Sequence, residues 1–317
     1  MQTSLVLINS LSQLTGCKIY GKAEFENPGG SIKDRAAKQI IEDAEFEAKL
    51  KPGGTIVEGT AGNTGIGLAV YGKPKGYKVV ICMANNQAQE KVEILKTLGA
   101  EVLLYKPCPF SDLNHFYHQA RKYSEENPNA FWANQFENLS NFKAHYTTTG
   151  PEIWNQTNGD IDFFVASVGT GGTMGGVSNF LKEKNSKIKT IVADPFGSGI
   201  YEYIKNGNFK TEGSSITEGI GIMRLTENFK KANVDSVIRV SDQQMIDMMY
   251  HLLKHDNLKL GTSAALNLFA VYEIAKMSEN KGKTFVTMLC DHGSRYESKV
   301  YDPRWLAEKN LIPKLIH

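Results

Sequence analysis

The stretch that decides the fold is "DFFVASVGTGGTMGGV", residues 162–177, together with "KTIVAD", residues 189–194. The run at 162–168 is almost wholly apolar, and a helix is expected from Met174 to Lys184 before the second apolar run begins. Short, fully apolar strands joined by helices are typical of parallel sheets that are covered on both faces. In such sheets ligands bind in the loops after the carboxyl ends of the strands, which is where this chain is rich in glycine.

The same alternation runs through almost the whole chain. Apolar positions recur at helical spacing after the short strands, as Val92, Leu95 and Leu98 do. A chain of 317 residues usually forms two domains, each with its own core. We therefore predict an α/β protein with two α/β domains, each a mostly parallel twisted sheet flanked by helices. The expected strands lie at 55–60, 78–83, 101–105 and 284–290, and the expected helices at 62–72, 88–99, 113–124, 242–255 and 264–278.

Composition and charge exclude several classes of protein. The chain is 41% hydrophobic and 22% charged, and its net charge is +2, with 36 basic residues scattered along it. Neither a nucleic acid nor an anionic membrane surface is therefore an expected partner. No apolar run approaches the ~18–20 residues that span a bilayer, so we expect a cytoplasmic protein. The four cysteines form no Cys-x-x-Cys pair, and we expect them to be small apolar fillers and not zinc ligands or disulfides.

The glycine-rich loop at 167–177 is a candidate phosphate site. It follows a strand and opens a helix, so its backbone N–H groups converge at the positive end of a helix dipole. A dinucleotide fingerprint starting at Gly169 would need glycine where Met174 stands, although Asp194 lies at a plausible distance for a ribose-binding acid. No Gly-Lys-Ser/Thr follows, which excludes a nucleotide P-loop. A site for one phosphate and a purely structural turn both stay open.

A second strand-to-helix loop, "EGTAGNTGIG" at 58–67, is a candidate carboxylate site. Successive N–H groups at the start of a helix can hold a carboxylate, and Thr60, Asn63 and Thr64 could add directional hydrogen bonds. An ordinary N-capped helix start fits the same residues equally well.

The segment "NPGGSIKDRAA", residues 27–37, carries a candidate nucleophile, Lys33. Ser31 suits the N-cap position, which would place Lys33 in the first helical turn. The positive end of the helix dipole lowers the pKa of an amine there, and attack on a carbonyl requires a neutral amine. A solvated ion pair with Asp34 is the commoner role for such a lysine. This segment alone does not decide between the two roles.

Two further patterns have ordinary structural explanations. Two histidine pairs have metal-like spacing but lack the glutamate that a zinc hydrolase needs, so we interpret them as surface histidines and expect no metal. Four apolar side chains on one expected helix should pack in the core. The histidines are His115, His118, His251 and His255, and the apolar residues are Met245, Met248, Met249 and Leu252.

In combination, these segments resemble the fold-type II pyridoxal-phosphate enzymes. The similarity covers essentially the whole chain, including "DHGSRYESK" at 291–299, and is closest to the cysteine synthases of the cysteine synthase/cystathionine β-synthase family. It implies a fold like the tryptophan synthase β-subunit, with a larger cofactor-binding domain of residues 1–34 and 146–317. Residues 35–145 would form a smaller mobile domain that carries the carboxylate loop. The motifs that carry the resemblance are "NPGGSIKDRAA", "EGTAGNTGIGLA", "NQFENLSN", "TTGPEIW", "GTGGTMGG" and "LGTSAALN".

The resemblance implies a role for each candidate site residue. Lys33 would bind the cofactor, pyridoxal 5′-phosphate, as a Schiff base and, once freed, would take the substrate α-proton. Asn63 would bond to the cofactor's 3′-oxygen. Ser263 would face the pyridine nitrogen, and because its hydroxyl is neutral the ring would be a weak electron sink, which disfavours transamination. The phosphate cradle would be Gly169, Thr170, Gly171, Gly172 and Thr173, and the substrate carboxylate would be gripped by Thr60, Ala61, Gly62, Thr64 and Gln135.

The implied reaction makes L-cysteine and acetate from O-acetyl-L-serine and sulfide through an aminoacrylate intermediate. Two departures from the family pattern bear on substrate preference. Ala61 replaces a usual serine, and Ala264 and Ala265 follow Ser263 where Ser-Gly is usual, which adds bulk to a backbone that passes the cofactor. The main alternatives are therefore cysteine β-elimination with release of sulfide, and a cystathionine β-synthase-type replacement with another nucleophile.

Other classes fit only part of the sequence. A nicotinamide dehydrogenase would account for the strands and one glycine loop, but not for Lys33. A non-catalytic relative that binds a partner in the cleft would not need Lys33, Asn63 and Ser263 together. Relatives are usually homodimers, which we expect here, and binding of a serine acetyltransferase stays open. "QTSLVLI" near the N-terminus also leaves open whether an upstream or organelle-targeting segment is missing.

Overall fold

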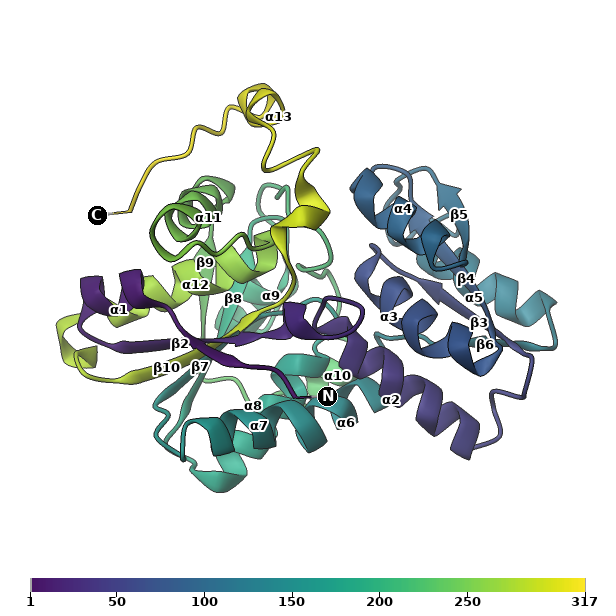
Figure 1. Cartoon of the computed structure of the whole chain (residues 1–317), viewed down its shortest axis with the longest axis horizontal. Coiled ribbons are helices and arrows are strands. Elements are labelled where there is room, and N and C mark those ends of the chain that lie inside the picture. Colours follow the sequence, from purple (N-terminus) through teal and green to yellow (C-terminus); the bar gives the residue numbers. More distant parts are fainter. Residues whose placement is uncertain (1, 317) are drawn as a thin grey trace.

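The computed structural model describes residues 2–316 and contains two sheets (Figure 1). The larger sheet has the strand order β1 (Leu5–Leu7), β2 (Lys18–Ala23), β10 (Thr284–Leu289), β7 (Phe163–Ser167), β8 (Lys189–Pro195) and β9 (Ser236–Val240). β1 runs antiparallel to β2, and the other neighbouring strands run parallel. The predicted α/β class is therefore confirmed.

The smaller sheet is parallel throughout. Its strand order is β5 (Glu101–Tyr105), β4 (Lys78–Ala84), β3 (Thr55–Gly59) and β6 (Ala130–Trp132). One of its faces is covered by α2 (Lys33–Phe46), α3 (Asn63–Gly72) and α4 (Gln89–Thr97), and the opposite face by α5 (Phe116–Glu126). In Figure 1 this unit lies to the right of the larger sheet, and α2 leads from one to the other.

The strands of the larger sheet bury both of their faces. Phe285 and Leu289 of β10 join one hydrophobic core, while the intervening Val286 and Met288 join the core on the other face. This alternation follows from the period of two along a strand, and it explains why the strands are apolar at almost every position. The first core is completed by α1 (Asn9–Thr15), α11 (Asp242–Asp256) and α12 (Thr262–Ala275), and the second by α7 (Gly150–Gln156) and α8 (Gly172–Lys184).

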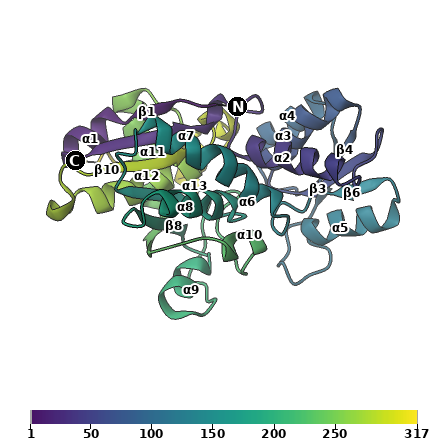
Figure 2. The same cartoon turned by 90° about the horizontal axis from the view of Figure 1, so that it is seen from below.

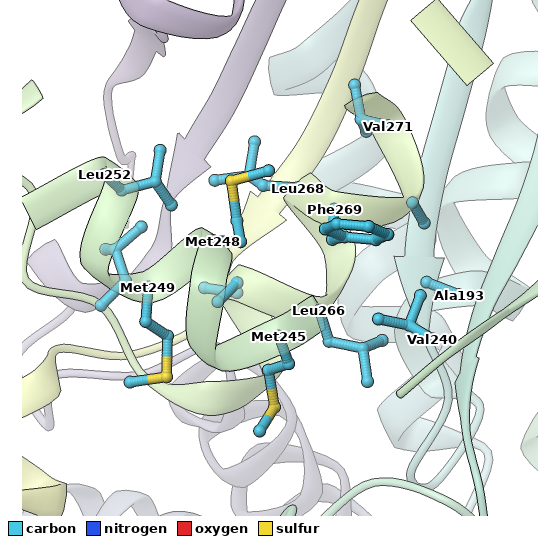
Figure 3. Packing of buried hydrophobic residues seen from close by; sticks show 14 of the residues in the cluster. Ala193, Val240, Met245, Met248, Met249, Leu252, Leu266, Leu268, Phe269 and Val271 are labelled. Carbon is cyan, nitrogen blue, oxygen red and sulfur yellow. The ribbon is translucent and has the colours of Figure 1, made fainter. Parts of the chain in front are cut away.

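The predicted core role of the α11 side chains is confirmed. Met245, Met248, Met249 and Leu252 are all fully buried. Figure 3 shows α11 next to α12, with Met248 beside Leu268, and with Leu266 and Phe269 on the side of Ala193 and Val240 of the sheet. Unbranched methionine side chains suit such an irregular interface between two helices.

Several element boundaries differ from the prediction. α8 begins at Gly172, two residues before the expected Met174, because Gly171 in the left-handed conformation precedes it. α5 begins at Phe116 because the His115 side chain accepts a hydrogen bond from the Tyr117 N–H and caps the helix there. β2 and β9 were not predicted. The remaining elements are α6 (Ser140–Ala144), a π-helical turn (His145–Thr149), α9 (Ile200–Asn206), α10 (Glu227–Lys230) and α13 (Pro303–Glu308).

The two predicted domain limits stay a prediction. The limit at 34/35 falls inside α2, and the limit at 145/146 falls inside the helical stretch that continues from α6 to α7. Because both limits fall within helices that connect the two sheets, the strand assignments do not fix the residue at which one domain ends. α9, within the expected larger domain, projects from the β9 edge of its sheet (Figure 2). Among residues 2–316, no helix has the length and apolar character needed to cross a membrane.

Candidate active site

A cavity of about 350 Å³ lies where the loops after the strands of both sheets meet. A smaller space of about 30 Å³ shares lining residues with it, among them Lys33 and Ser263. Most of the predicted site residues line one or both spaces, as expected for the carboxyl ends of parallel strands. These residues are Lys33, Thr60, Ala61, Asn63, Thr64, Gln135, Gly169, Thr170, Gly171, Thr173 and Ser263.

Two predicted residues, Gly62 and Gly172, are not among the lining residues. Each is instead in close contact with a neighbouring side chain. A Cβ atom at Gly62 would lie 2.8 Å from the Lys91 side chain, and one at Gly172 would lie 2.0 Å from Asn141 Oδ1. Only their backbone groups are therefore available to a ligand.

Lys33 is the first residue of α2, so the predicted first-turn position is correct. The cap differs from the expectation, because the N-cap residue is Ile32 and the Ser31 hydroxyl accepts the Lys33 N–H at 3.3 Å. Burial lowers the pKa of Lys33. Within residues 2–316, its amine has no hydrogen bond or ion pair, and Asp34 accepts from the Gly29 N–H instead. The solvated ion pair is therefore the wrong interpretation.

The helix that carries Lys33 is held in place by a buried ionic network. Arg35 is 1% exposed and donates to Glu24 at 2.7 Å and to Glu152 at 2.7 Å. Glu152 also pairs with the buried Lys22 of β2 at 2.7 Å. Buried charges of this kind hold their geometry because breaking one pair leaves an uncompensated charge. The network therefore anchors the first turn of α2 to β2 and α7.

Lys91 is a second lysine in the cavity wall, and it was not predicted. Its Nζ atom lies 2.6 Å from the Glu218 carboxylate and 4.3 Å from the centre of the Tyr296 ring. Glu218 also pairs with Lys299. Although burial favours the neutral carboxyl, these two lysines lower the pKa of Glu218. Lys91 is thus held as a paired cation, whereas Lys33 is the amine without a partner.

The glycine loop before α8 is closely packed against neighbouring segments of the chain. A Cβ atom at Gly169 would lie 2.2 Å from the Gly219 carbonyl oxygen, and one at Gly171 would lie 2.6 Å from Phe229 Cα. Gly171 also has a φ of +87°. The first N–H groups of α8 have no partner within the helix and converge beside the cavity. The loop is thus shaped to bring backbone N–H groups to an anion.

The other end of the site is formed by Ser263 and Cys290, which both line the cavity. Ser263 lies in the first turn of α12. Burial raises the pKa of the Cys290 thiol to about 11, so this group is neutral. Ala264 and Ala265 are fully buried in the core and are not among the lining residues. The bulk that they add to this backbone therefore lies in the core cluster and not in the cavity wall.

Gln135 and Glu58 fix the loop after β3 through a chain of hydrogen bonds. The Thr64 hydroxyl donates to Gln135 Oε1 at 2.5 Å, and Gln135 Nε2 donates to Glu58 Oε1 at 3.2 Å. Glu58 is fully buried, and burial raises its pKa to about 8. Sequence reasoning missed Glu58, since an acidic residue in a strand gives no signal of its partner 77 residues away.

Glu58 predicts a specific dependence of stability on pH. Its pKa in the folded protein, about 8, exceeds the ordinary value of 4.5, so between these values the folded chain holds more protons. Stability contributed by protonated Glu58 is complete below about pH 4.5 and is lost as the pH rises, by at most about 1.4 kcal/mol per pH unit. The unfolding free energy of the wild type should therefore fall relative to that of Glu58→Gln between about pH 5 and about pH 8. A constant difference in urea titrations would contradict this.

The far wall of the cavity is aromatic and was also missed. Phe110, Tyr117 and Phe136 surround the Arg224 guanidinium at 4.7, 5.2 and 5.4 Å from the ring centres. Arg224 is ion-paired with Glu137. His115 lines the same wall, so its assignment to the surface is wrong. The sequence around His115 does not indicate that it lines a cavity, because the wall is formed by loops that are far apart in the chain.

The second predicted histidine pair, His251 and His255, also differs in part from the expectation. His251 is 2% exposed and its Nε2 lies 3.0 Å from the Ser10 hydroxyl, so the surface interpretation is wrong for this residue as well. His255 is exposed, and its ring centre lies 4.6 Å from that of His251 with the two planes tilted by 38°. Within residues 2–316, no group of three or more His, Cys, Asp or Glu side chains could hold a metal ion. The cysteines in this range form no disulfide, and three of the four are buried.

Comparison with known proteins places this site in a family. The model of the family described as pyridoxal-phosphate dependent enzyme matches residues 1–291, so the chain belongs to that family. Cysteine synthase 1 of Neurospora crassa is 49% identical over 98% of this chain and 84% of its own length. Cysteine synthase of Dictyostelium discoideum is 47% identical over the same shares, 98% and 84%.

Other proteins similar to this chain are named for a different activity from that of the cysteine synthases. The O-acetylserine dependent cystathionine beta-synthase of Bacillus subtilis is 36% identical, with 94% of both chains covered. A crystal structure of an O-acetylserine dependent cystathionine beta-synthase from Helicobacter pylori superposes with a TM-score of 0.85 at 30% identity, covering 94% of this chain and 95% of that one. The fold is therefore that of the fold-type II pyridoxal-phosphate enzymes.

The residues of the cavity fit the family's cofactor, pyridoxal phosphate. The glycine loop offers N–H groups to a single phosphate and has no room for side chains. Lys33 supplies an unpaired amine beside it, and Ser263 supplies a neutral hydroxyl. The phosphate, the aldehyde and the ring nitrogen of the cofactor therefore each have a matching group among the residues that line these two neighbouring spaces.

Proposed function

We propose that the chain makes L-cysteine and acetate from O-acetyl-L-serine and sulfide. The observation that carries the proposal is that an unpaired amine, Lys33, and the loop of residues 60–64 line the same cavity. The cysteine synthases at 47–49% identity support it. In the reaction the bond from the β-carbon to the acetate oxygen breaks, and a bond from sulfur to that carbon forms.

We assign the binding of the substrate to the loop after β3. Its N–H groups, with the hydroxyls of Thr60 and Thr64, hold the α-carboxylate, and Gln135 fixes Thr64. Ala61 lines the cavity without a hydroxyl of its own, so the carboxylate there relies on backbone donors. The glycine loop would hold the phosphate of the cofactor, and Asn63 would hold its 3′-oxygen.

We assign proton transfer to Lys33. Pyridoxal phosphate, when bound, withdraws electrons from the substrate α-carbon and so makes its proton acidic. Burial lowers the pKa of the Lys33 amine, which makes the neutral form available to accept that proton. Closure of the loop over the substrate excludes water, which protects reactive species from hydrolysis.

A second candidate is β-replacement by a larger thiol, as in the cystathionine β-synthases. The observation that favours it is the wall of Phe110, Tyr117, Phe136 and Arg224, which a nucleophile as small as sulfide does not need. Cysteine β-elimination is a third outcome of the same site. We also propose a cytoplasmic location, which the free cysteines support; a homodimer and an association with serine acetyltransferase stay predictions.

Steady-state kinetics of the purified holoenzyme test the proposal. With O-acetylserine fixed, kcat/KM for sulfide is expected to exceed kcat/KM for L-homocysteine. The rate of cysteine formation is expected to exceed the rate of sulfide release from cysteine. A higher kcat/KM for homocysteine would favour the second candidate, and faster release of sulfide would show that elimination is the main reaction.

A further inference from the structure

Arg295 joins two loops of the site without lining the cavity. It is 6% exposed and lies in the turn Gly293–Tyr296 near the C-terminus. Its Nη1 donates to Asn63 Oδ1 at 2.5 Å, and its Nη2 donates to the Gly29 carbonyl oxygen. Gly29 belongs to the loop that leads into Lys33. One guanidinium thus connects the loop before Lys33 with the start of α3.

The amide of Asn63 is held at both ends. Its Nδ2 donates to Asp291 Oδ2 at 2.6 Å, and the Tyr296 hydroxyl donates to the same oxygen at 2.7 Å. A guanidinium only donates, so the Asn63 oxygen must face Arg295 and the amide cannot turn over. The second hydrogen of Nδ2 is left for a group in the cavity, which Asn63 lines.

The loop before Lys33 is built around the same guanidinium. A Cβ atom at Gly30 would lie 2.7 Å from Arg295 Nη2, and the φ of Gly30 is +74°. The structure therefore requires glycine at position 30, because a side chain there would displace Arg295 and strain the backbone. The Gly-Gly pair of "NPGGSIK" thus belongs to this contact as well as to the helix start.

We propose that Arg295 is a positioning residue for the cofactor. By holding Gly29 and Asn63 with one planar group, it sets the distance between the Lys33 amine and the Asn63 amide. The fork geometry matters, because a guanidinium can address two acceptors at once and an ammonium is a point charge. The proposal rests on the role given to Asn63 in the proposed function.

The test is a double-mutant cycle on cofactor affinity, in which cofactor-depleted full-length protein is titrated with pyridoxal phosphate and no amino acid. Arg295→Gln is expected to weaken binding about 10- to 100-fold, the effect of one hydrogen bond to a charged group. Asn63→Ala should weaken it similarly. If Arg295 acts through Asn63, the double variant should bind about as weakly as the weaker single variant. Effects that multiply, or unchanged affinity in Arg295→Gln, would overturn the proposal.

Two further variants separate positioning from folding. Arg239→Gln removes another largely buried arginine with carboxylate partners, Glu202 and Glu212, outside the site, and should leave the affinity unchanged. Arg295→Lys keeps the buried charge but not the fork, so it should keep the wild-type unfolding midpoint and still bind the cofactor more weakly. Wild-type affinity in Arg295→Lys would overturn the proposal even if Arg295→Gln fails to fold. Because no substrate is present, the result does not depend on which amino acid the enzyme converts.

Discussion

Replacing Lys33 by alanine is expected to reduce cysteine formation by about 10³-fold or more, the contribution of a positioned acid–base group. The variant should fold, because the Lys33 side chain has no hydrogen bond or ion pair within residues 2–316 and its loss leaves no partner unsatisfied. The Lys91 amine cannot substitute, since Glu218 holds it as a cation. The measurement is the initial rate of cysteine formation at saturating O-acetylserine.

Lys38→Ala is the matched control for this variant. Lys38 lies on the same helix, is partly exposed and pairs loosely with Glu42 at 3.6 Å. A partly exposed ion pair of this kind contributes little to the free energy of unfolding, so the activity and stability of Lys38→Ala should stay near those of the wild type. Comparable losses in both variants would contradict a specific role for Lys33 and point to damage to α2.

The second large effect is expected for Gly171→Ala. A side chain at a φ of +87° strains the backbone, and the new Cβ would lie 2.6 Å from the Phe229 backbone. Strain and overpacking together should destabilise the protein by about 2–5 kcal/mol. The loop must shift to relieve the contact, so the holoenzyme should lose its cofactor on dialysis. Urea titrations and cofactor content measure the two effects.

Gly207→Ala separates strain from packing. Gly207 has a φ of +74°, but a Cβ atom there meets no atom within 4 Å. Its variant should therefore lose only about 1–2 kcal/mol and keep the cofactor. Equal losses of stability in the two variants would mean that the contact with Phe229 has no effect.

The parts of the site that were predictable are those with local signals. Lys33, the glycine loop and the loop after β3 each follow a strand or open a helix, so their neighbours in sequence already indicate a ligand. The apolar strands β7 and β8 were predictable for a similar reason, because burial on both faces makes nearly every position apolar. In these cases the physical cause lies within about ten residues of the effect.

The parts that were missed depend on distant partners. The strand β2 contains two lysines, and its Lys22 is compatible with burial because Glu152, Gln156 and the Thr3 carbonyl oxygen surround its amine. Arg295 contacts residues 232 and 266 positions away in the chain. His115 looks like a surface histidine until the loops around Arg224 are brought together. A single sequence carries no record of such contacts.

The assignment of the cofactor to Lys33 is tested by reducing the holoenzyme with borohydride and mapping the modified peptide. Two lysines line the cavity, and of these Lys91 is ion-paired with Glu218. The cofactor mass is therefore expected on Lys33, and it should be absent from Lys91. Cofactor fixed to Lys91, or to no lysine at all, would contradict the assignment of Lys33.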